Sequence, residues 1–300
     1  MKVWIQAMRL RTLPLAASCI FAGAAAARVS DGFNFTTRLL CIFGLTLLTT
    51  FLLQVLSNFA NDFGDFSHGV DNENRIGPKR TLQSGVITRA QMKVALILTT
   101  FLTLVSGFVL LWIVFAPTHQ FIQASIMLGL GLAAIAAAIK YTVGDNPYGY
   151  RGLGDLFVFL IFGPVGVMGT TYLLTFEVPN NAWLLALTTG LYSAAVLNLN
   201  NLRDHENDRV SGKRTLIVMW DFNKGKLYQS SLILIATLSL LIWIIINGNS
   251  PISWLALLPG FIQCTLLIKV WRCKVPAELD SELKKVALLT FLISLIVCLA

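Results

Sequence analysis

The chain contains nine apolar runs, each long enough to cross a bilayer as a helix. A membrane-spanning helix needs about 20 consecutive, mostly apolar residues. Hydrophobic residues make up 56% of the 300 residues and charged residues only 13%, whereas a soluble domain carries about 25% charged residues. The sequence therefore predicts an all-α polytopic membrane protein with a single domain covering residues 1–300. The expected spans are residues 12–29, 37–59, 92–115, 121–140, 154–175, 182–201, 226–247, 252–271 and 284–300.

The first apolar run also has features of a removable signal peptide. Basic residues precede it, and it ends in four alanines before Arg28, a pattern similar to a small-residue cleavage site. Eight further runs need no removable signal, because each can itself insert as a helix. We therefore expect residues 12–29 to remain as the first membrane helix.

Basic residues are distributed unevenly between the two sides of the membrane. With nine spans, the N-terminus and the loops after the second, fourth, sixth and eighth spans share one side. All but two of the 23 Lys and Arg residues fall on that side, and the exceptions are Arg28 and Arg38. Such a bias places the basic side in the cytoplasm. It also accounts for the net charge of +8, so the charge gives no reason to expect a nucleic-acid partner.

Two acid-rich segments close the second and sixth apolar runs, and both are therefore expected on the cytoplasmic side. Carboxylates cost about 2.5–3.5 kcal/mol each at mid-bilayer, and those retained near a membrane usually serve a function. The residues of each segment have the i, i+3 or i+4, and i+7 spacing of one helix face. They are Asn58, Asp62 and Asp65 in the first segment and Asn201, Asp204 and Asp208 in the second.

Both faces combine an amide oxygen with two carboxylates. Mg²⁺ accepts such hard oxygen ligands and is commonly bound by one or two carboxylates together with substrate phosphates. The alternative is that these residues are polar helix ends at the membrane interface. Two clusters of matching type on one side, each followed by basic residues, favour two metal half-sites for a polyanionic ligand, above all a diphosphate.

These segments resemble the paired aspartate motifs of the UbiA-type intramembrane prenyltransferases. That family carries Asn-Asp-x-x-Asp after the second helix and Asp-x-x-x-Asp after the sixth, and the corresponding segments here are Asn61–Asp65 and Asp204–Asp208. Many members have another Asp four residues after each motif, where this chain has Gly69 and Gly212. This departure leaves open whether Asp71 is a metal ligand.

Further segments resemble the branch of this family that acts on 1,4-dihydroxy-2-naphthoate in menaquinone synthesis. They are Arg9–Pro14, Ser57–Asp65, Asp71–Pro78, Pro147–Asp155 and Gly212–Leu216. The resemblance implies Mg²⁺-dependent transfer of a long chain from a polyprenyl diphosphate to the naphthoate ring. Loss of the ring carboxylate would then give a demethylmenaquinone.

The resemblance also implies roles for individual residues. Two Mg²⁺ ions and nearby basic groups would neutralise the charge that develops on the leaving diphosphate. The expected catalytic residues are Asp62, Asp65, Asp204 and Asp208. The expected metal ligands are these four with Asn58, Asn61 and Asn201. The expected substrate contacts are Arg11, Asn58, Arg75, Lys79, Arg80, Lys140, Tyr148, Lys213 and Arg214.

The same chemistry predicts one cavity that is open to the cytoplasmic side and laterally to lipid. The polyprenyl tail would lie in the bilayer or a lateral groove, and its diphosphate head would reach the cytoplasmic pocket. An enclosed apolar cavity would keep water away from the allylic cation. The expected partners are thus the polyprenyl diphosphate, the naphthoate and the lipid bilayer, and the expected location is the bacterial inner membrane.

Other functions predict different features. Within the family, the acceptor could be 4-hydroxybenzoate or homogentisate. A transporter would carry charged groups at mid-membrane and inverted repeats with broken helices, whereas here the acids cluster at helix ends. The phosphatidyl-alcohol transferases keep both halves of their aspartate motif close in sequence, unlike Asp62 and Asp204. A purely structural membrane subunit would leave both clusters unexplained.

Overall fold

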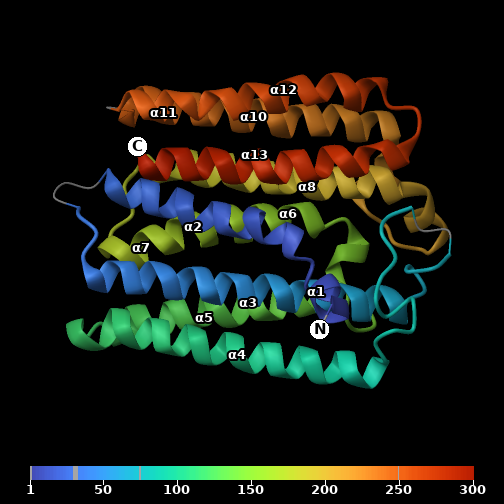
Figure 1. Cartoon of the computed structure of the whole chain (residues 1–300), viewed down its shortest axis with the longest axis horizontal. Coiled ribbons are helices and arrows are strands. Elements are labelled where there is room, and N and C mark those ends of the chain that lie inside the picture. The colour runs from blue at the N-terminus through green and yellow to red at the C-terminus, as the bar shows by residue number, and fades with distance from the viewer. Residues whose placement is uncertain (1, 30–32, 74–75, 249) are drawn as a thin grey trace.

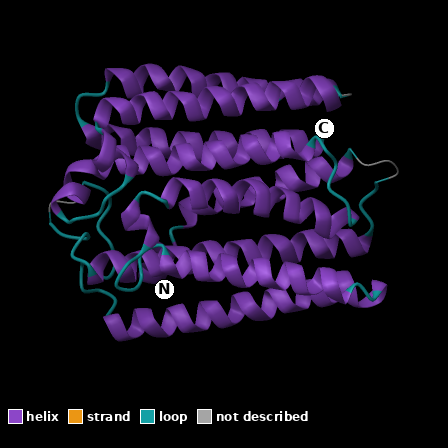
Figure 2. Ribbon diagram, turned by 180° about the vertical axis from the view of Figure 1, so that it is seen from behind, coloured by secondary structure: helices purple, strands orange, loops and turns teal. Residues whose placement is uncertain are grey.

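The computed structural model describes residues 2–29, 33–73, 76–248 and 250–300, and within these ranges it contains helices and no strand. The long helices lie side by side with their axes nearly parallel (Figure 1). The loops gather at the two ends of this bundle, with the longest loops at one end (Figure 2). The predicted all-α polytopic architecture is confirmed.

The first half of the chain supplies one side of the bundle. Its elements are α1 (Lys2–Met8), η1 (Leu10–Thr12), α2 (Leu13–Arg28), α3 (Thr37–Ser67), α4 (Arg89–Phe115), η2 (Ala116–Thr118), α5 (Phe121–Lys140) and η3 (Tyr148–Arg151). Helix α4 begins with a capping box, in which the Thr88 side chain accepts from the Gln91 backbone N–H and the Gln91 side chain accepts from the Thr88 backbone N–H. This reciprocal pair satisfies two N–H groups that have no partner within the helix.

The second half completes the bundle. Its elements are α6 (Gly154–Leu160), η4 (Ile161–Met168), α7 (Gly169–Thr175), α8 (Ala182–Val210), α9 (Leu216–Trp220), α10 (Phe222–Asn247), α11 (Pro251–Leu255), α12 (Leu257–Arg272), η5 (Pro276–Glu278) and α13 (Leu279–Leu299). Helix α8 packs against α10 and α13, and α13 packs against α2. These helices form the tightly packed part of the bundle.

Eight helical segments in the described part of the chain are long and apolar enough to cross a membrane, one fewer than the nine predicted runs. The ninth run corresponds to α13, which has 21 residues and a length of about 30 Å. Its first two turns contain Asp280, Glu282, Lys284 and Lys285. Because of these charges, α13 does not meet the apolar composition that defines the eight candidate membrane helices. Its remaining turns are apolar.

The two acid-bearing helices extend beyond their predicted apolar runs. The apolar runs suggested ends near residues 59 and 201, but α3 continues to Ser67 and α8 to Val210. Each helix is followed by a glycine with a positive φ, 72° at Gly69 and 75° at Gly212. A glycine in this conformation ends a helix without the steric cost that another residue would meet. Both acidic motifs therefore stand on the last turns of regular helices.

The fifth span contains a widened turn. Residues Ile161–Met168 form a π-helix that includes Pro164, which has no N–H group to donate to the helix ladder. Gly163 lies against α8, since a Cβ there would be 2.6 Å from the Ala186 carbonyl oxygen. Gly163 and Pro164 thus coincide with a π-bulge, a feature often found at functional sites.

Candidate active site

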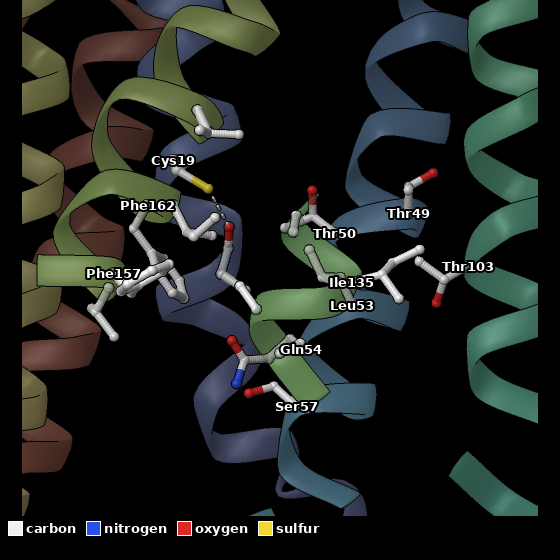
Figure 3. A pocket seen from close by; sticks show the side chains of 18 of the residues that line it. Cys19, Thr49, Thr50, Leu53, Gln54, Ser57, Thr103, Ile135, Phe157 and Phe162 are labelled. Atoms are coloured by element: carbon white, nitrogen blue, oxygen red, sulfur yellow. Dashed lines mark hydrogen bonds between the residues drawn. The ribbon is translucent and has the colours of Figure 1, made fainter. Parts of the chain in front are cut away.

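A cavity of about 420 Å³ runs through the bundle between α2, α3, α4, α5, the α6–α7 span and α8 (Figure 3). One end is charged and is lined by Arg11, Asp65, Arg80, Arg203 and Lys213. The remaining length is lined mainly by apolar side chains, with a few hydroxyl and amide groups. Such a cavity matches an amphiphile with an anionic head and a long apolar tail.

The wall of the cavity formed by α4 and α5 is incompletely covered by the rest of the bundle. Several of the lining residues on these two helices are exposed. Phe108, for example, lines the cavity and is 61% exposed. An apolar molecule could therefore enter from the side of the bundle without passing the charged end.

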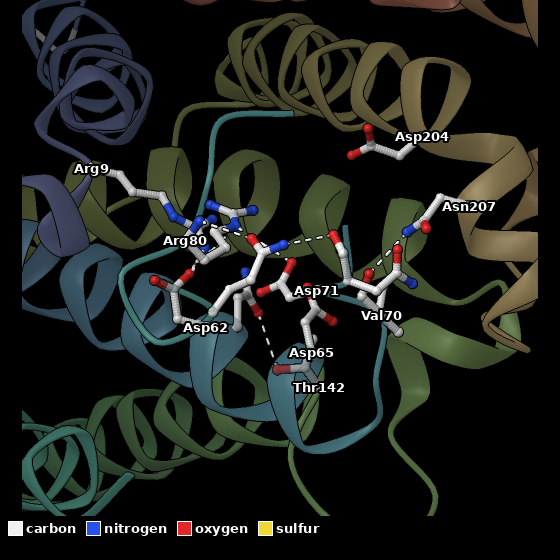
Figure 4. Close-up of polar contacts among 12 residues, drawn as sticks. Arg9, Asp62, Asp65, Val70, Asp71, Arg80, Thr142, Asp204 and Asn207 are labelled. Atoms are coloured by element: carbon white, nitrogen blue, oxygen red, sulfur yellow. Dashed lines mark hydrogen bonds and ion pairs between the residues drawn. The ribbon is translucent and has the colours of Figure 1, made fainter. Parts of the chain in front are cut away.

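In the first motif, Asp62 is paired with Arg9 and lies near Arg80 (Figure 4). The Arg80 Nε atom is 3.6 Å from Oδ1 of Asp62 and 3.8 Å from Oδ1 of Asp71. The side chains of Asp62 and Asp71 are 2% and 0% exposed. Burying a carboxylate is costly unless a positive charge lies close to it, and the two arginines supply that charge.

Arg9 reaches Asp62 because α1 is fixed against α3. The Trp4 ring packs edge-on against Phe59 at 5.9 Å between ring centroids. The Asn58 amide donates to the Met8 carbonyl at 2.9 Å and to Thr12 Oγ1 at 3.1 Å. The amide nitrogen of Asn58, a predicted metal and substrate residue, is thus used to hold the start of the chain beside the motif.

Asp65 receives two groups from distant segments. The Tyr150 hydroxyl donates to Oδ1 of Asp65 at 2.7 Å, and the Lys213 ammonium lies 3.4 Å from the same oxygen. Burial and the Asp65 charge raise the pKa of Tyr150 above its ordinary value, so its hydroxyl remains a donor. Burial lowers the pKa of Lys213, but the charges of Asp65, Asp208 and Asp204 outweigh it, and the pKa lies above its ordinary value.

The loop after α5 reaches Asp65 through a close contact with α3. A Cβ at Gly64 would be 2.4 Å from the Thr142 carbonyl oxygen, so only glycine permits this approach. The Thr142 hydroxyl donates to the Ala60 carbonyl at 2.9 Å and to Asn61 Oδ1 at 3.3 Å. Asn61, another predicted ligand, is therefore oriented by this loop.

In the second motif, Arg203 holds Asp204 with two hydrogen bonds. Its Nε atom donates to Oδ1 at 2.9 Å and its Nη2 atom to Oδ2 at 2.6 Å. The same guanidinium donates to Asn200 Oδ1 and to Asp280 at the start of α13. This arrangement leaves the Arg203 side chain only 2% exposed.

The two motifs meet at the charged end of the cavity, as the predicted topology required. The Asn207 amide donates to the Val70 carbonyl at 2.9 Å (Figure 4). The Asn72 amide donates to Ser211 Oγ at 3.3 Å. Asp208 is buried, and its backbone carbonyl accepts from the Lys213 N–H at 2.8 Å. The segments that follow α3 and α8 are thus joined by direct contacts.

The buried carboxylates suit a hard divalent cation by their chemistry. Five aspartates around the charged end are each at most 6% exposed, namely Asp62, Asp65, Asp71, Asp204 and Asp208. In the described part of the chain, no group of three or more His, Cys, Asp and Glu side chains is close enough to hold an ion by itself. Mg²⁺ fits this donor set, because it completes its shell with waters and substrate phosphates.

The other predicted substrate residues lie in different places. Arg11 and Arg80 line both the main cavity and a second cavity of about 290 Å³, which Lys79 also lines. Lys140 and Arg214 are exposed and lie outside the lining of the main cavity. Arg75 lies outside the described residues.

Tyr148 and Asn201 are two further predicted site residues, and of these only Tyr148 lines the cavity. Tyr148 lines the cavity, its hydroxyl donates to the Ala137 carbonyl at 2.8 Å, and its ring packs on Phe157 at 4.2 Å between centroids. Asn201 is buried, and its neighbour Asn200 lines the cavity.

Four contacting residues were absent from the predicted site. Arg9, Tyr150 and Arg203 lie within or beside the motif-like segments, so their positions in the sequence could have suggested them. Asp280 lies in none of those segments, and no pattern in the sequence connects it with α8. Only the packing of α13 against α8 brings it to Arg203.

Comparison with known proteins identifies the family. The profile of the UbiA prenyltransferase family matches residues 16–296. The chain belongs to the UbiA prenyltransferase family. This UbiA protein is 41% identical over 298 residues to a 1,4-dihydroxy-2-naphthoate octaprenyltransferase from Haemophilus influenzae, covering 99% of this chain and 94% of the relative. It is also 41% identical over 257 residues to the protein of that name from Escherichia coli, covering 86% and 81%.

Solved structures of the UbiA family have the same fold. A homologue from Aeropyrum pernix K1, in its apo form, superposes with a TM-score of 0.65 at 16% identity, covering 96% of each chain. A homologue from Archaeoglobus fulgidus, bound to GPP and Mg²⁺, gives a TM-score of 0.59 at 16% identity, covering 98% of this chain and 100% of the other. Together with its eight apolar helices, the family identifies the chain as an integral membrane protein.

Proposed function

We propose that this UbiA protein transfers a polyprenyl group from a polyprenyl diphosphate to 1,4-dihydroxy-2-naphthoate in menaquinone synthesis. The observation that carries the proposal is the cavity, which joins a charged end to a long apolar interior. The names of the two bacterial relatives at 41% identity support the choice of acceptor. The product would be a demethylmenaquinone.

We propose that two Mg²⁺ ions bind at the charged end, held by Asp62 and Asp65 from α3 and by Asp204 and Asp208 from α8. Asn58, Asn61 and Asn201 would complete the set or orient its members. The homologue from Archaeoglobus fulgidus binds Mg²⁺ together with GPP, which supports this class of ion. Bound Mg²⁺ would act as a Lewis acid that neutralises charge on the leaving diphosphate.

The basic residues of the site would take part in binding the diphosphate. Arg9, Arg80, Arg203 and Lys213 each lie next to a motif carboxylate, so they also surround the space that a diphosphate head would occupy. Lys213 remains charged, because its pKa is raised, and it can donate to a phosphate oxygen. Charge-assisted bonds of this kind are shorter and stronger than neutral ones. Arg11 and Lys79 would extend the cationic surface toward the second cavity.

The apolar interior would hold the polyprenyl tail and exclude water. Breaking the bond between the allylic carbon and the diphosphate oxygen leaves an electron-poor carbon, which water would capture if it had access. The new bond forms from the ring carbon that bears the carboxylate. Release of CO₂ then returns the electron pair of the broken carbon–carboxylate bond to the ring and restores the aromatic diol.

We propose that the charged end faces the cytoplasm in a bacterial inner membrane. The distribution of Lys and Arg supports this orientation. Every segment with a motif residue lies at the same end of the bundle, and the C-terminus lies at the opposite end (Figure 1). The aromatic acceptor and the released diphosphate would then exchange with the cytoplasm, while the lipid substrate enters from the side of the bundle.

Product analysis tests the proposal. Purified protein would be offered one polyprenyl diphosphate together with 1,4-dihydroxy-2-naphthoate, 4-hydroxybenzoate and homogentisate, and the products would be identified by mass spectrometry. We expect prenylation of the naphthoate with loss of one CO₂, and little reaction with the others. A preference for either of the other acids would overturn the choice of acceptor within the family. Retention of a carboxyl label in the prenylated naphthoate would overturn the decarboxylating step.

A further inference from the structure

Two polar side chains project into the cavity where its charged end meets its apolar interior. Gln54 and Ser57 lie on α3, and both line the cavity (Figure 3). The Gln54 amide nitrogen makes a long contact of 3.4 Å with Asn58 Oδ1. Among the described residues, neither Gln54 Oε1 nor Ser57 Oγ has a hydrogen-bond partner. An amide oxygen and a hydroxyl group that face an apolar space without partners are unfavourable, so these two groups indicate a ligand with polar atoms at this level.

Several other hydroxyl groups along the same cavity differ from this pair, although among the described residues Thr50 also lines the cavity without a hydrogen-bond partner. Thr49 donates to the Leu45 carbonyl at 2.8 Å, and Thr103 donates to the Thr99 carbonyl at 2.7 Å. These bonds to the preceding helical turn satisfy the hydroxyl donors within their own helices. A polyprenyl tail can therefore pass them without leaving their donors unpaired.

The wall of the cavity across from α3 carries aromatic side chains. Phe157 and Phe162 come from the α6–η4 segment and line the cavity on that side (Figure 3). Tyr148 packs on Phe157 with an angle of 30° between the rings. A flat ring with polar groups along one edge fits between such walls, because aromatic faces pack favourably with one another.

The pair also lies next to the reacting end of the donor substrate. Ser57, Asn61 and Asp65 are four residues apart along α3 and so share one face of the helix. All three line the cavity. A diphosphate held beside Asp65 would therefore place its first allylic carbon near the level of Ser57.

We propose that Gln54 and Ser57 bind the ring hydroxyl groups of the phenolic acceptor and select it over rings that lack them. This assignment rests on the proposed prenyl transfer and adds the residues that recognise the acceptor. The hydrocarbon part of the donor has no group that could bond to either side chain. The two residues therefore act on the aromatic substrate and not on the polyprenyl diphosphate.

The variant Gln54→Leu tests the assignment, because leucine is of similar size and removes only the amide. Two measurements are needed: the KM of each substrate, and binding of 1,4-dihydroxy-2-naphthoate alone, followed by quenching of protein fluorescence. We expect the KM and the dissociation constant for the naphthoate to rise about tenfold, as is typical for loss of a buried hydrogen bond. The KM for the polyprenyl diphosphate should stay within about twofold. Ser57→Ala should give a smaller change in the same direction.

Gln263→Leu is the matched control. Gln263 is a fully buried glutamine on α12, its side-chain amide has no hydrogen-bond partner within the described ranges, and it lies outside the cavity lining. This variant should leave both KM values unchanged. An unchanged naphthoate KM in Gln54→Leu, or an equal rise in the KM for the diphosphate, would overturn the assignment. A wild-type protein that does not consume the naphthoate would instead overturn the proposed function.

Discussion

The Tyr150 hydroxyl donates a 2.7 Å hydrogen bond to Oδ1 of Asp65, across 85 residues of sequence. Lys213, from the segment after α8, approaches the same oxygen at 3.4 Å. One carboxylate of the first motif is therefore held by the loops that follow two other membrane helices. These two contacts hold the segments at the charged end of the cavity together.

Removing one carboxylate charge from either motif should nearly abolish turnover. Asp62→Asn and Asp204→Asn keep the size of each side chain but remove the charge that a divalent cation requires. We expect a loss of about 100-fold or more in kcat, together with a lower unfolding temperature, because Asp62 and Asp204 each pair with a buried arginine. EDTA should have the same effect, and added Mg²⁺ should reverse it.

Asp145→Asn is the matched control for these two variants, since Asp145 is an exposed carboxylate in the loop after α5. Its activity should equal that of the wild type. Full activity of either variant would contradict the proposal that α3 and α8 each supply part of the metal site.

Tyr150→Phe should weaken the site without dismantling it. The variant removes one hydrogen bond to Asp65 and keeps the ring, and a net loss of about 1 kcal/mol is typical for such a bond. The expected result is a fall in kcat/KM of about fivefold, together with a higher Mg²⁺ concentration for half-maximal activity. If the Mg²⁺ dependence is unchanged, Tyr150 does not position Asp65 for the metal.

The glycines that end α3 and α8 should resist substitution. Gly69→Ala and Gly212→Ala would place a side chain in the left-handed region, at a cost of about 1–2 kcal/mol each. We expect a lower thermal unfolding temperature and reduced activity, since both turns lead directly into site residues. Gly44 lies inside α3 with open space around its Cα. Gly44→Ala should therefore leave the unfolding temperature unchanged or raise it. If Gly44→Ala lowers the unfolding temperature as much as the other two variants, the positive φ is not the cause.

Arg203→Ala should be the most destabilising of these substitutions. The side chain is 2% exposed and pairs with Asp204 and Asp280, so its removal takes away the buried positive charge that these two carboxylates share. Breaking a buried pair in this way typically costs about 3–5 kcal/mol. The exposed pair of Lys224 with Asp221 offers a comparison, because Lys224→Ala should cost at most about 1 kcal/mol. Chemical or thermal unfolding in detergent would measure both.

Reporter fusions test the predicted orientation. A reporter inserted in the loop between α3 and α4 should read as cytoplasmic, and one fused after Ala300 should read as outside the cytoplasm. This outcome requires α13 to cross the membrane as the ninth span. A cytoplasmic reading at Ala300 would mean that only eight helices cross.

The amino-acid sequence by itself determined the helices and the end of the bundle at which the site lies. In a bilayer every backbone polar group must be satisfied within its own segment, so apolar length alone specifies a helix. Residues 121–140 and 154–175 were predicted with the bounds that the structure shows. Apolar length alone ended α3 and α8 too early, because polar residues continue each helix until a glycine stops it, as the helical spacing of the motif residues had indicated.

The tertiary structure alone decided which groups meet. Helical spacing predicted Asn201 as the amide of the second motif, but the rotation of α8 in the bundle turns Asn200 toward the cavity. The pairing of Asp62 with Arg9, and of Arg203 with Asp280, depends on how α1 and α13 pack against the acid-bearing helices. A charge pair is set by a few ångströms of separation between distant segments. Periodicity along a chain reports the face of each helix, but it carries no information about which neighbour that face will contact.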